Sequence, residues 1–201
     1  MRVNKPKPDK AGWEVTGETE HYADDHLAVI TEQVRAPSRS HPKAWTTVRR
    51  KSAVVIAAMT RDDKLLLVRQ ERIPIRAALW EVPAGQIDEA EPRLEQIEAT
   101  ALRELREETA HVLASDGELV ALGDFFASPG FTDEQEYLFL ARPVEPLRDQ
   151  KIDPEEAIID CRAFSIAEVQ EMIARHEIRD ANTLSICARL VARGLIQFVP
   201  R

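Results

Sequence analysis

The pattern of apolar and polar residues first predicts strands. In residues 27–32 the side chains of Leu27, Val29 and Thr31 would face one way and those of Ala28, Ile30 and Glu32 the other, as in a strand. Residues 53–59 are apolar throughout, and residues 65–70 follow after a polar turn at 61–64. These two apolar runs are therefore predicted to form a hairpin whose strands are covered on both faces.

One helix is predicted over residues 94–109. Leu94, Ile97, Ala101 and Leu105 recur at spacings of three and four, which places them in a single apolar stripe. The stripe predicts a helix that packs one side against a core and leaves its other side polar.

Further elements follow this helix. Ser165 and Glu168 have the S-x-x-E spacing of a capping box, which marks the start of another helix. The mixed order of strands and helices predicts the α/β class, with helices on the faces of a sheet. The predicted strands span residues 117–127, 136–141 and 158–164, and the predicted helices span residues 165–174 and 181–191.

Composition and charge narrow the class of function. The 201 residues are 44% hydrophobic and 31% charged, as in an ordinary globular protein. The net charge of −8 argues against binding to a nucleic-acid backbone, and no apolar run is long enough to span a membrane. Cys161 and Cys187 lie in no metal or redox motif, so we expect two buried thiols in a reducing cytoplasm.

An acidic cluster lies on the polar side of the predicted helix. Glu104, Glu107 and Glu108 are three and four residues apart, so they share one surface. The cluster can be a solvated helix face whose repulsion is relieved by Arg103 and Arg106. It can also be a site for a hard cation, because Mg²⁺ prefers oxygen ligands.

The residues upstream favour the cation site. Gly85 and Glu95, taken with residues 103–108, resemble the signature of the Nudix hydrolases. That signature is a glycine, five residues, a glutamate, seven residues, and then Arg-Glu-aliphatic-x-Glu-Glu-x-Gly-aliphatic.

This sequence departs from the signature at three points. The segment between the glycine and the arginine is four residues too long, so either Glu91 or Glu95 can be the first glutamate. Ala110 stands where the family has glycine, although a helix end there often needs a positive φ. His111 replaces an aliphatic residue, and we expect it to be a turn residue rather than a ligand.

The resemblance extends beyond the signature. Residues 66–72, 128–134 and 178–183 are similar to the ADP-ribose pyrophosphatase branch, in which a proline at the position of Pro129 follows the signature. The match runs from about residue 53 to residue 195. In that branch, N-terminal strands help to form a homodimer.

Three segments are therefore expected along the chain. Residues 1–12 would be a flexible tail, residues 13–50 a strand extension suited to dimerisation, and residues 51–201 a Nudix domain. The resemblance implies an α/β/α sandwich with a mixed sheet for that domain.

The resemblance also implies roles for the acidic cluster. Glu104 and Glu108 would be the first metal ligands, and Glu107 is the next candidate for that role. The carbonyl of Ala84 would be a further ligand. Arg103 would orient the carboxylates. The implied cofactor is Mg²⁺, with Mn²⁺ as a substitute.

The general base is left open among three acidic residues. The branch places this base in a loop after the signature, and here that loop holds Asp153, Glu155 and Glu156. Glu156 aligns best with an acidic position of the loop, whereas the position that often supplies the base falls on Pro154. Such an acidic loop can also be without a role.

Substrate contacts are implied for three residues. Arg72 matches an arginine that contacts the ligand in the branch. Glu81 and Glu134 are weaker candidates, for the diphosphate–metal region and a ribose hydroxyl respectively. Trp80 can stack on a base, although a core position is the plainer interpretation.

The expected function is Mg²⁺-dependent hydrolysis of a nucleoside diphosphate linked to another group. ADP-ribose, cleaved to AMP and ribose 5-phosphate, is the first candidate, and a nucleotide sugar such as GDP-mannose is the alternative. A third hypothesis is a sensor that binds ADP-ribose without cleaving it. No basic surface supports RNA decapping.

Overall fold

The computed structural model describes residues 12–88, 93–148, 152 and 157–199. The described chain divides into two compact units. The first takes its residues from 1–52, 88–91 and 126–135, and the second takes the remainder.

The first unit is built on an antiparallel sheet of three strands. Its order is β1 (Glu14–Ala23), β2 (Leu27–Arg35) and β3 (Lys43–Arg50), so the strand predicted at residues 27–32 is confirmed. Arg49 is buried and lies 2.8 Å from carboxylate oxygens of both Glu18 and Glu32. These ion pairs connect all three strands.

A distant segment completes this unit along β3. The amide of Val48 donates to the carbonyl of Phe131 at 3.0 Å, and Val48 forms a parallel bridge with Thr132. The indole of Trp45 donates to the carbonyl of Gly130 at 3.1 Å. Residues 126–135 therefore pack as part of the N-terminal sheet unit.

The second unit is built on a mixed sheet. The strand order is β10 (Ile158–Phe164), β5 (Leu65–Arg72), β4 (Ala53–Thr60), β9 (Gln135–Pro146) and β8 (His111–Phe126), with β4 and β9 parallel. A short 3₁₀ helix (Ile73–Ile75) follows β5; β6 (Ala77–Glu81) pairs with β5, and β7 (Ala84–Gln86) pairs with β4. The predicted hairpin is confirmed, since Met59 of β4 pairs with Leu65 of β5.

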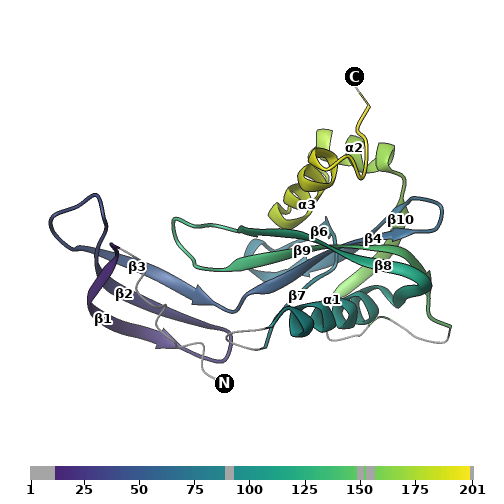
Figure 1. The fold of residues 1–201 in the computed structure, drawn as a ribbon. Helices are drawn as coiled ribbons and strands as arrows, with labels where there is room; N and C mark the ends of the chain where they lie inside the picture. The colour runs from purple at the N-terminus through teal and green to yellow at the C-terminus, as the bar shows by residue number, and fades with distance from the viewer. Residues whose placement is uncertain (1–11, 89–92, 149–151, 153–156, 200–201) are drawn as a thin grey trace. The chain divides into compact units, whose positions relative to one another are not determined.

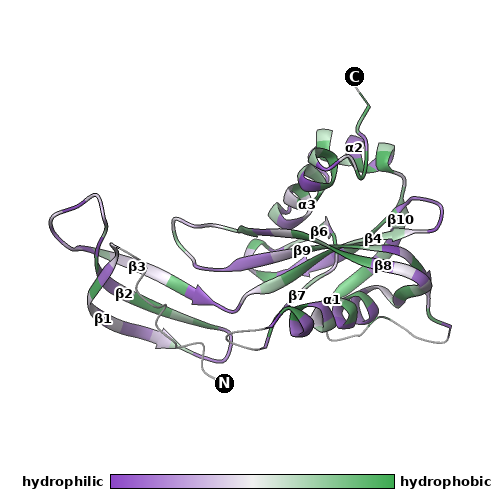
Figure 2. Cartoon of the chain, in the orientation of Figure 1, coloured by the Kyte–Doolittle hydropathy of each residue, from purple (hydrophilic) through white to green (hydrophobic). Residues whose placement is uncertain are grey.

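Helices cover both faces of this sheet (Figure 1). On one face, α1 (Leu94–Thr109) packs against β4 through Ile97, Ala101 and Leu105, whereas Leu94 of the predicted apolar stripe is exposed. On the other face, α2 (Ile166–Ala174) and α3 (Ala181–Ala192) pack against Val55 and Ala57. Burial on two faces explains why β4 is apolar throughout, as its colour in Figure 2 shows.

The helix ends follow the local sequence. Ala110 has φ 54°, in the left-handed region, and its amide donates to the carbonyl of Arg106 at 3.0 Å. The alanine at the glycine position of the signature therefore does not change how the helix ends. Ser165 and Glu168 form the predicted capping box of α2.

The cysteines differ from each other in burial. Cys187 is buried in the core of the second unit, where burial raises the pKa of its thiol to about 12. Cys161 is only partly buried on β10, which corrects the expectation of two buried thiols. No helix of the described chain is long and apolar enough to cross a membrane.

Candidate active site

The acidic cluster lies in the last two turns of α1. Glu104 follows Ala101 by three residues and Glu108 follows Leu105 by three, so both flank the apolar stripe, and only Glu107 points further from it. This corrects the expectation that the whole cluster lies on the polar side of the helix. Glu104 and Glu108 are only 4% and 1% exposed, respectively, although both carry carboxylates. The side chain of Glu107 is 25% exposed. Burial of charge is costly unless partners compensate, so the surroundings of this cluster decide what it can do.

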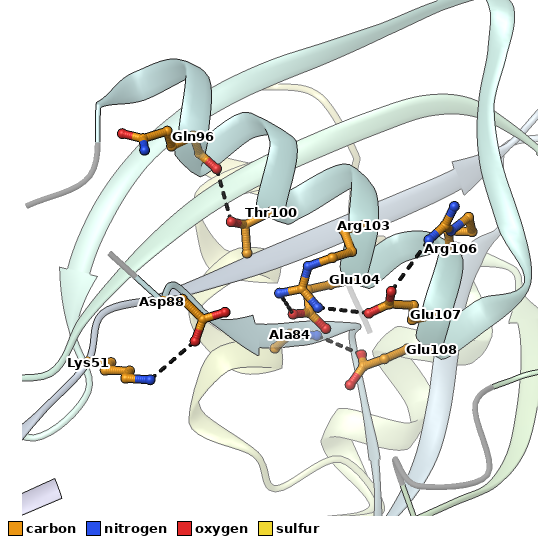
Figure 3. Close-up of polar contacts among 10 residues, drawn as sticks. All are labelled: Lys51, Ala84, Asp88, Gln96, Thr100, Arg103, Glu104, Arg106, Glu107 and Glu108. Carbon is orange, nitrogen blue, oxygen red and sulfur yellow. Dashed lines mark hydrogen bonds and ion pairs between the residues drawn. The ribbon is translucent and has the colours of Figure 1, made fainter. Parts of the chain in front are cut away.

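The segment from Ala84 to Gly85, at the start of β7, holds two of these carboxylates. The amide of Ala84 donates to Oε2 of Glu108 at 2.8 Å (Figure 3). A Cβ atom added at Gly85 would overlap the carboxylate of Glu104. Glycine therefore leaves the space that this carboxylate occupies, and it is not needed for backbone conformation, since its φ is not in the left-handed region.

Arg103 joins the other carboxylates. Its guanidinium nitrogens lie 2.6 Å from Oε1 of Glu104 and 2.8 Å from Oε2 of Glu107, as Figure 3 shows. Arg106 approaches Glu107 more distantly, at 3.5 Å. The positive charge of Arg103 relieves repulsion between two neighbouring glutamates and fixes the direction of both carboxylates.

The site fits a hard divalent cation through few protein ligands. In the described residues, no three or more His, Cys, Asp or Glu side chains converge as a metal cage. Mg²⁺ does not need one, because it is commonly held by one or two carboxylates together with substrate phosphates. Buried oxygens of Glu104 and Glu108 beside the small residues Ala84 and Gly85 suit that mode of binding.

Arg72 and Glu81 form an ion pair on the adjacent strands β5 and β6. Nη2 of Arg72 lies 2.5 Å from Oε2 of Glu81, and Nε donates to the same carboxylate at 3.1 Å. Burial raises the pKa of Glu81, and the hydrogen bond and charge of Arg72 oppose that rise. The arginine side chain is 40% exposed, so part of it stays available to a ligand.

Glu134 belongs to the first compact unit, where Arg50 is its partner. The guanidinium of Arg50 lies 3.0 Å from Glu134, and the amide of Arg50 donates to Asp133 at 3.0 Å. Burial raises the pKa of Glu134, while the charge of Arg50 lowers it, with a net rise.

Trp80 takes the core position that was its plainer interpretation, whereas His111 belongs to a strand and not to a turn as predicted. Trp80 packs against the core beside α2 and α3, and its ring meets Phe164 edge-on at 5.1 Å. His111 begins β8, directly after the helix end, and its Nδ1 lies 2.7 Å from the carbonyl of Thr109.

Several predicted residues lie outside the described part of the chain. These are the candidate bases Asp153, Glu155 and Glu156, and one of the two candidates for the first signature glutamate, Glu91. The other candidate, Glu95, is exposed in the first turn of α1.

Thr183 was not predicted as a site residue, yet it contacts the segment that leads into β7. The hydroxyl oxygen of this buried residue accepts a hydrogen bond from the amide of Val82 at 2.9 Å. The only signal in the sequence was the similarity of residues 178–183 to the branch.

A mixed sheet between helices, with buried carboxylates of one helix set against a glycine-containing strand, defines an α/β sandwich with a candidate cation site. Residues 49–185 match the NUDIX domain family, and the chain therefore belongs to the Nudix hydrolases. Members of this family generally use divalent metal ions.

Three curated relatives show what the chain is similar to. An ADP-ribose pyrophosphatase of Bacillus subtilis (strain 168) is 30% identical over 157 residues, 78% of this chain and 80% of the relative. An ADP-ribose pyrophosphatase of Mycobacterium tuberculosis (strain ATCC 25618 / H37Rv) is 31% identical over 84% of this chain and 77% of the relative. A methanol dehydrogenase activator of Bacillus methanolicus is 32% identical over 68% of this chain and 70% of the relative.

A solved structure confirms the fold. The crystal structure of an ADP compounds hydrolase superposes with a TM-score of 0.72 over 92% of this chain and 97% of the other, at 17% sequence identity. The predicted α/β sandwich with a mixed sheet is thus confirmed.

Proposed function

We propose that this Nudix hydrolase cleaves the diphosphate of ADP-ribose with water, giving AMP and ribose 5-phosphate. The observation that carries the proposal is the set of contacts between α1 and β7. There Glu104 and Glu108 lie buried against Ala84 and Gly85. Two curated relatives named ADP-ribose pyrophosphatase support this choice of substrate.

In this proposal Glu104 and Glu108 hold Mg²⁺, with the carbonyl of Ala84 as a further ligand and Glu107 beside them. The ion supplies charge stabilisation at the phosphate oxygens and lowers the pKa of an attacking water. Arg103 keeps the carboxylates directed, through its contacts with Glu104 and Glu107. Mn²⁺ has the same preference for oxygen ligands and would replace Mg²⁺.

The remaining roles follow the same scheme. Arg72 would contact the substrate through the exposed part of its guanidinium, while Glu81 holds it in place from β6. Glu134 would bind a ribose hydroxyl. The base that takes the proton from water would be Glu156, with Glu155 and Asp153 as the other candidates.

Incubation with a panel of nucleoside diphosphate conjugates tests the proposal. Purified protein would be given ADP-ribose, GDP-mannose and dinucleotides with MgCl₂, and products would be separated by ion-exchange chromatography. We expect AMP and ribose 5-phosphate from ADP-ribose, no product with EDTA, and recovery on addition of MnCl₂. Preferred turnover of GDP-mannose would make the chain a nucleotide-sugar pyrophosphatase instead.

A non-catalytic sensor is the second candidate function, and binding separates it from the enzyme. Calorimetry with ADP-ribose in EDTA would detect a ligand that is bound but not cleaved. Tight binding without turnover in either metal would favour the sensor and contradict the proposed reaction.

We also propose a homodimer in the cytoplasm. The first unit exposes large apolar side chains on its strands: Tyr22 of β1 is 54% exposed and Trp45 of β3 is 48% exposed. The strand register places these two aromatic side chains on opposite faces of the sheet, so each face offers an exposed apolar group to a second chain. We expect sedimentation equilibrium to give the molar mass of two chains; the mass of one chain would contradict the dimer.

The proposed cytoplasmic location is supported by the cysteines. The free thiols of Cys161 and Cys187 suit a reducing compartment.

A further inference from the structure

The residues between β6 and β7 are held by three different elements. Pro83 has no backbone N–H, so Val82 and Ala84 supply the only backbone donors of residues 82–84. The amide of Val82 donates to Thr183 of α3 at 2.9 Å, and that of Ala84 donates to Glu108 of α1 at 2.8 Å. The carbonyl of Pro83 accepts from the amide of Ile56 of β4 at 2.9 Å.

The hydrogen bond to Thr183 has a fixed direction. Oγ1 of Thr183 donates its one proton to Oδ2 of Asp180 at 2.8 Å, so towards Val82 the same oxygen acts as an acceptor. Asp180 is the N-cap of α3, and its Oδ2 also accepts a hydrogen bond from the amide of Thr183 at 2.8 Å. Thr183 is fully buried, so water does not compete for its hydroxyl.

A chain of contacts thus leads from α3 to the acidic helix. Asp180 orients the hydroxyl of Thr183, which holds Val82. Two residues further along, Ala84 holds the carboxylate of Glu108.

From these contacts we infer that Thr183, oriented by Asp180, is a positioning residue for the metal site. Its hydroxyl fixes the backbone that presents the amide and carbonyl of Ala84, and through that amide it fixes Glu108. This inference rests on the proposed metal site, but not on the identity of the substrate. Residues behind a metal's ligands typically change metal affinity or activity about 10- to 100-fold when they are altered.

Substitutions at Thr183 test the inference by metal affinity and kinetics. Mn²⁺ affinity of the full-length protein would be measured without substrate, from the electron paramagnetic resonance of the free ion. Thr183→Val keeps the shape but loses the acceptor. We expect it to weaken Mn²⁺ binding and to lower kcat, each by roughly tenfold, with little change in KM.

The conservative variant separates positioning from packing. Thr183→Ser restores the hydroxyl without the methyl group, and we expect Mn²⁺ affinity and kcat close to those of the parent. Parent-like Mn²⁺ affinity and kcat in Thr183→Val would overturn the inference, whatever happens to its melting temperature.

A second pair of variants decides the matter if Thr183→Val does not fold. Asp180→Ala removes the cap that orients Thr183, and Ser165→Ala removes the corresponding cap of α2, whose partner is Glu168 of the same helix. We expect Mn²⁺ affinity to fall in Asp180→Ala alone. Equal affinities in these two variants would overturn the inference.

The parent protein reports separately on the proposed function. A parent that binds Mn²⁺ but cleaves no conjugate contradicts the proposed reaction, while the ratio of Mn²⁺ affinities still tests Thr183. A parent that binds no Mn²⁺ would overturn both.

Discussion

Gly85 and the carboxylate of Glu104 occupy adjoining space, such that a Cβ at position 85 would overlap the carboxylate. The atoms in the way are the far end of a flexible side chain, so the fold can accept a methyl group if Glu104 moves. Such a substitution should therefore disturb the proposed metal site and leave the packing of the core unchanged.

We therefore expect Gly85→Ala to fold and to lose activity. Displacing a proposed ligand by about 1 Å is enough to lower kcat/KM about a hundredfold, and the melting temperature should change little. Kinetics with ADP-ribose and thermal denaturation would measure both. Gly17→Ala is the control, since its Cβ would meet Gln33 at an ordinary 3.6 Å; equal activities in the two variants would contradict the proposed role of Glu104.

Glu108→Gln tests the second buried carboxylate. Glutamine keeps an oxygen to accept the amide of Ala84, so the contact and the fold should persist, while the negative charge for the cation is lost. We expect kcat to fall by at least about a hundredfold, as for loss of a direct ligand. Glu98→Gln, on the same helix, should retain parental turnover. Turnover at the parental rate in Glu108→Gln would remove this residue from the metal site.

Ala110→Gly should stabilise the protein. The left-handed conformation at φ 54° costs a residue with a Cβ about 1–2 kcal/mol, and the flexibility of glycine in the unfolded chain offsets about half of this. We expect a gain of about 0.5–1 kcal/mol, or a melting temperature higher by about 1–4 °C. Ala99→Gly, inside α1, should instead destabilise by about 1 kcal/mol; destabilisation by both would mean that the helix ends differently.

Arg72→Met should make stability depend more strongly on pH. Burial raises the pKa of Glu81 above its usual value, and Arg72 limits that rise. A carboxyl with a raised folded-state pKa contributes stability that is complete below its unfolded-state pKa and is lost as pH rises through the folded-state pKa. Without Arg72 this pKa rises further, so the loss at neutral pH becomes larger.

The expected loss in Arg72→Met is small near pH ~4 and about 1–2 kcal/mol near pH ~8, below that of a fully buried pair because Arg72 is 40% exposed. Urea denaturation across this pH range would measure it. The double variant Arg72→Met/Glu81→Gln should lose the added pH dependence. If it keeps that dependence, another group is responsible.

Periodic and strongly apolar segments could be predicted from the sequence. Helix α1 spans the residues 94–109 that its apolar spacing indicated, and β4 was evident from the apolar run at residues 53–59. By contrast, β6 and β7 were missed. They span five and three residues, most of them only half-buried, and Pro83 lies between them.

The site was predictable in its residue types but not in its contacts. The spacing of Glu104 and Glu108 follows from helix geometry alone. Their burial against Ala84 and Gly85 depends on how α1 packs on β7, and the contact of Thr183 with Val82 spans 101 positions of sequence. Local patterns do not encode such long-range hydrogen bonds.

The attachment of residues 126–135 to β3 has a consequence for the order of folding. The contacts of Trp45 with Gly130 and of Arg50 with Asp133 join positions 85 and 83 residues apart. During synthesis the first three strands leave the ribosome early, yet β3 has no partner along its outer edge until the 85 residues from Trp45 to Gly130 have been made. Such non-local pairing is slow, so the N-terminal sheet should be the last part of the chain to reach its final protection from hydrogen exchange.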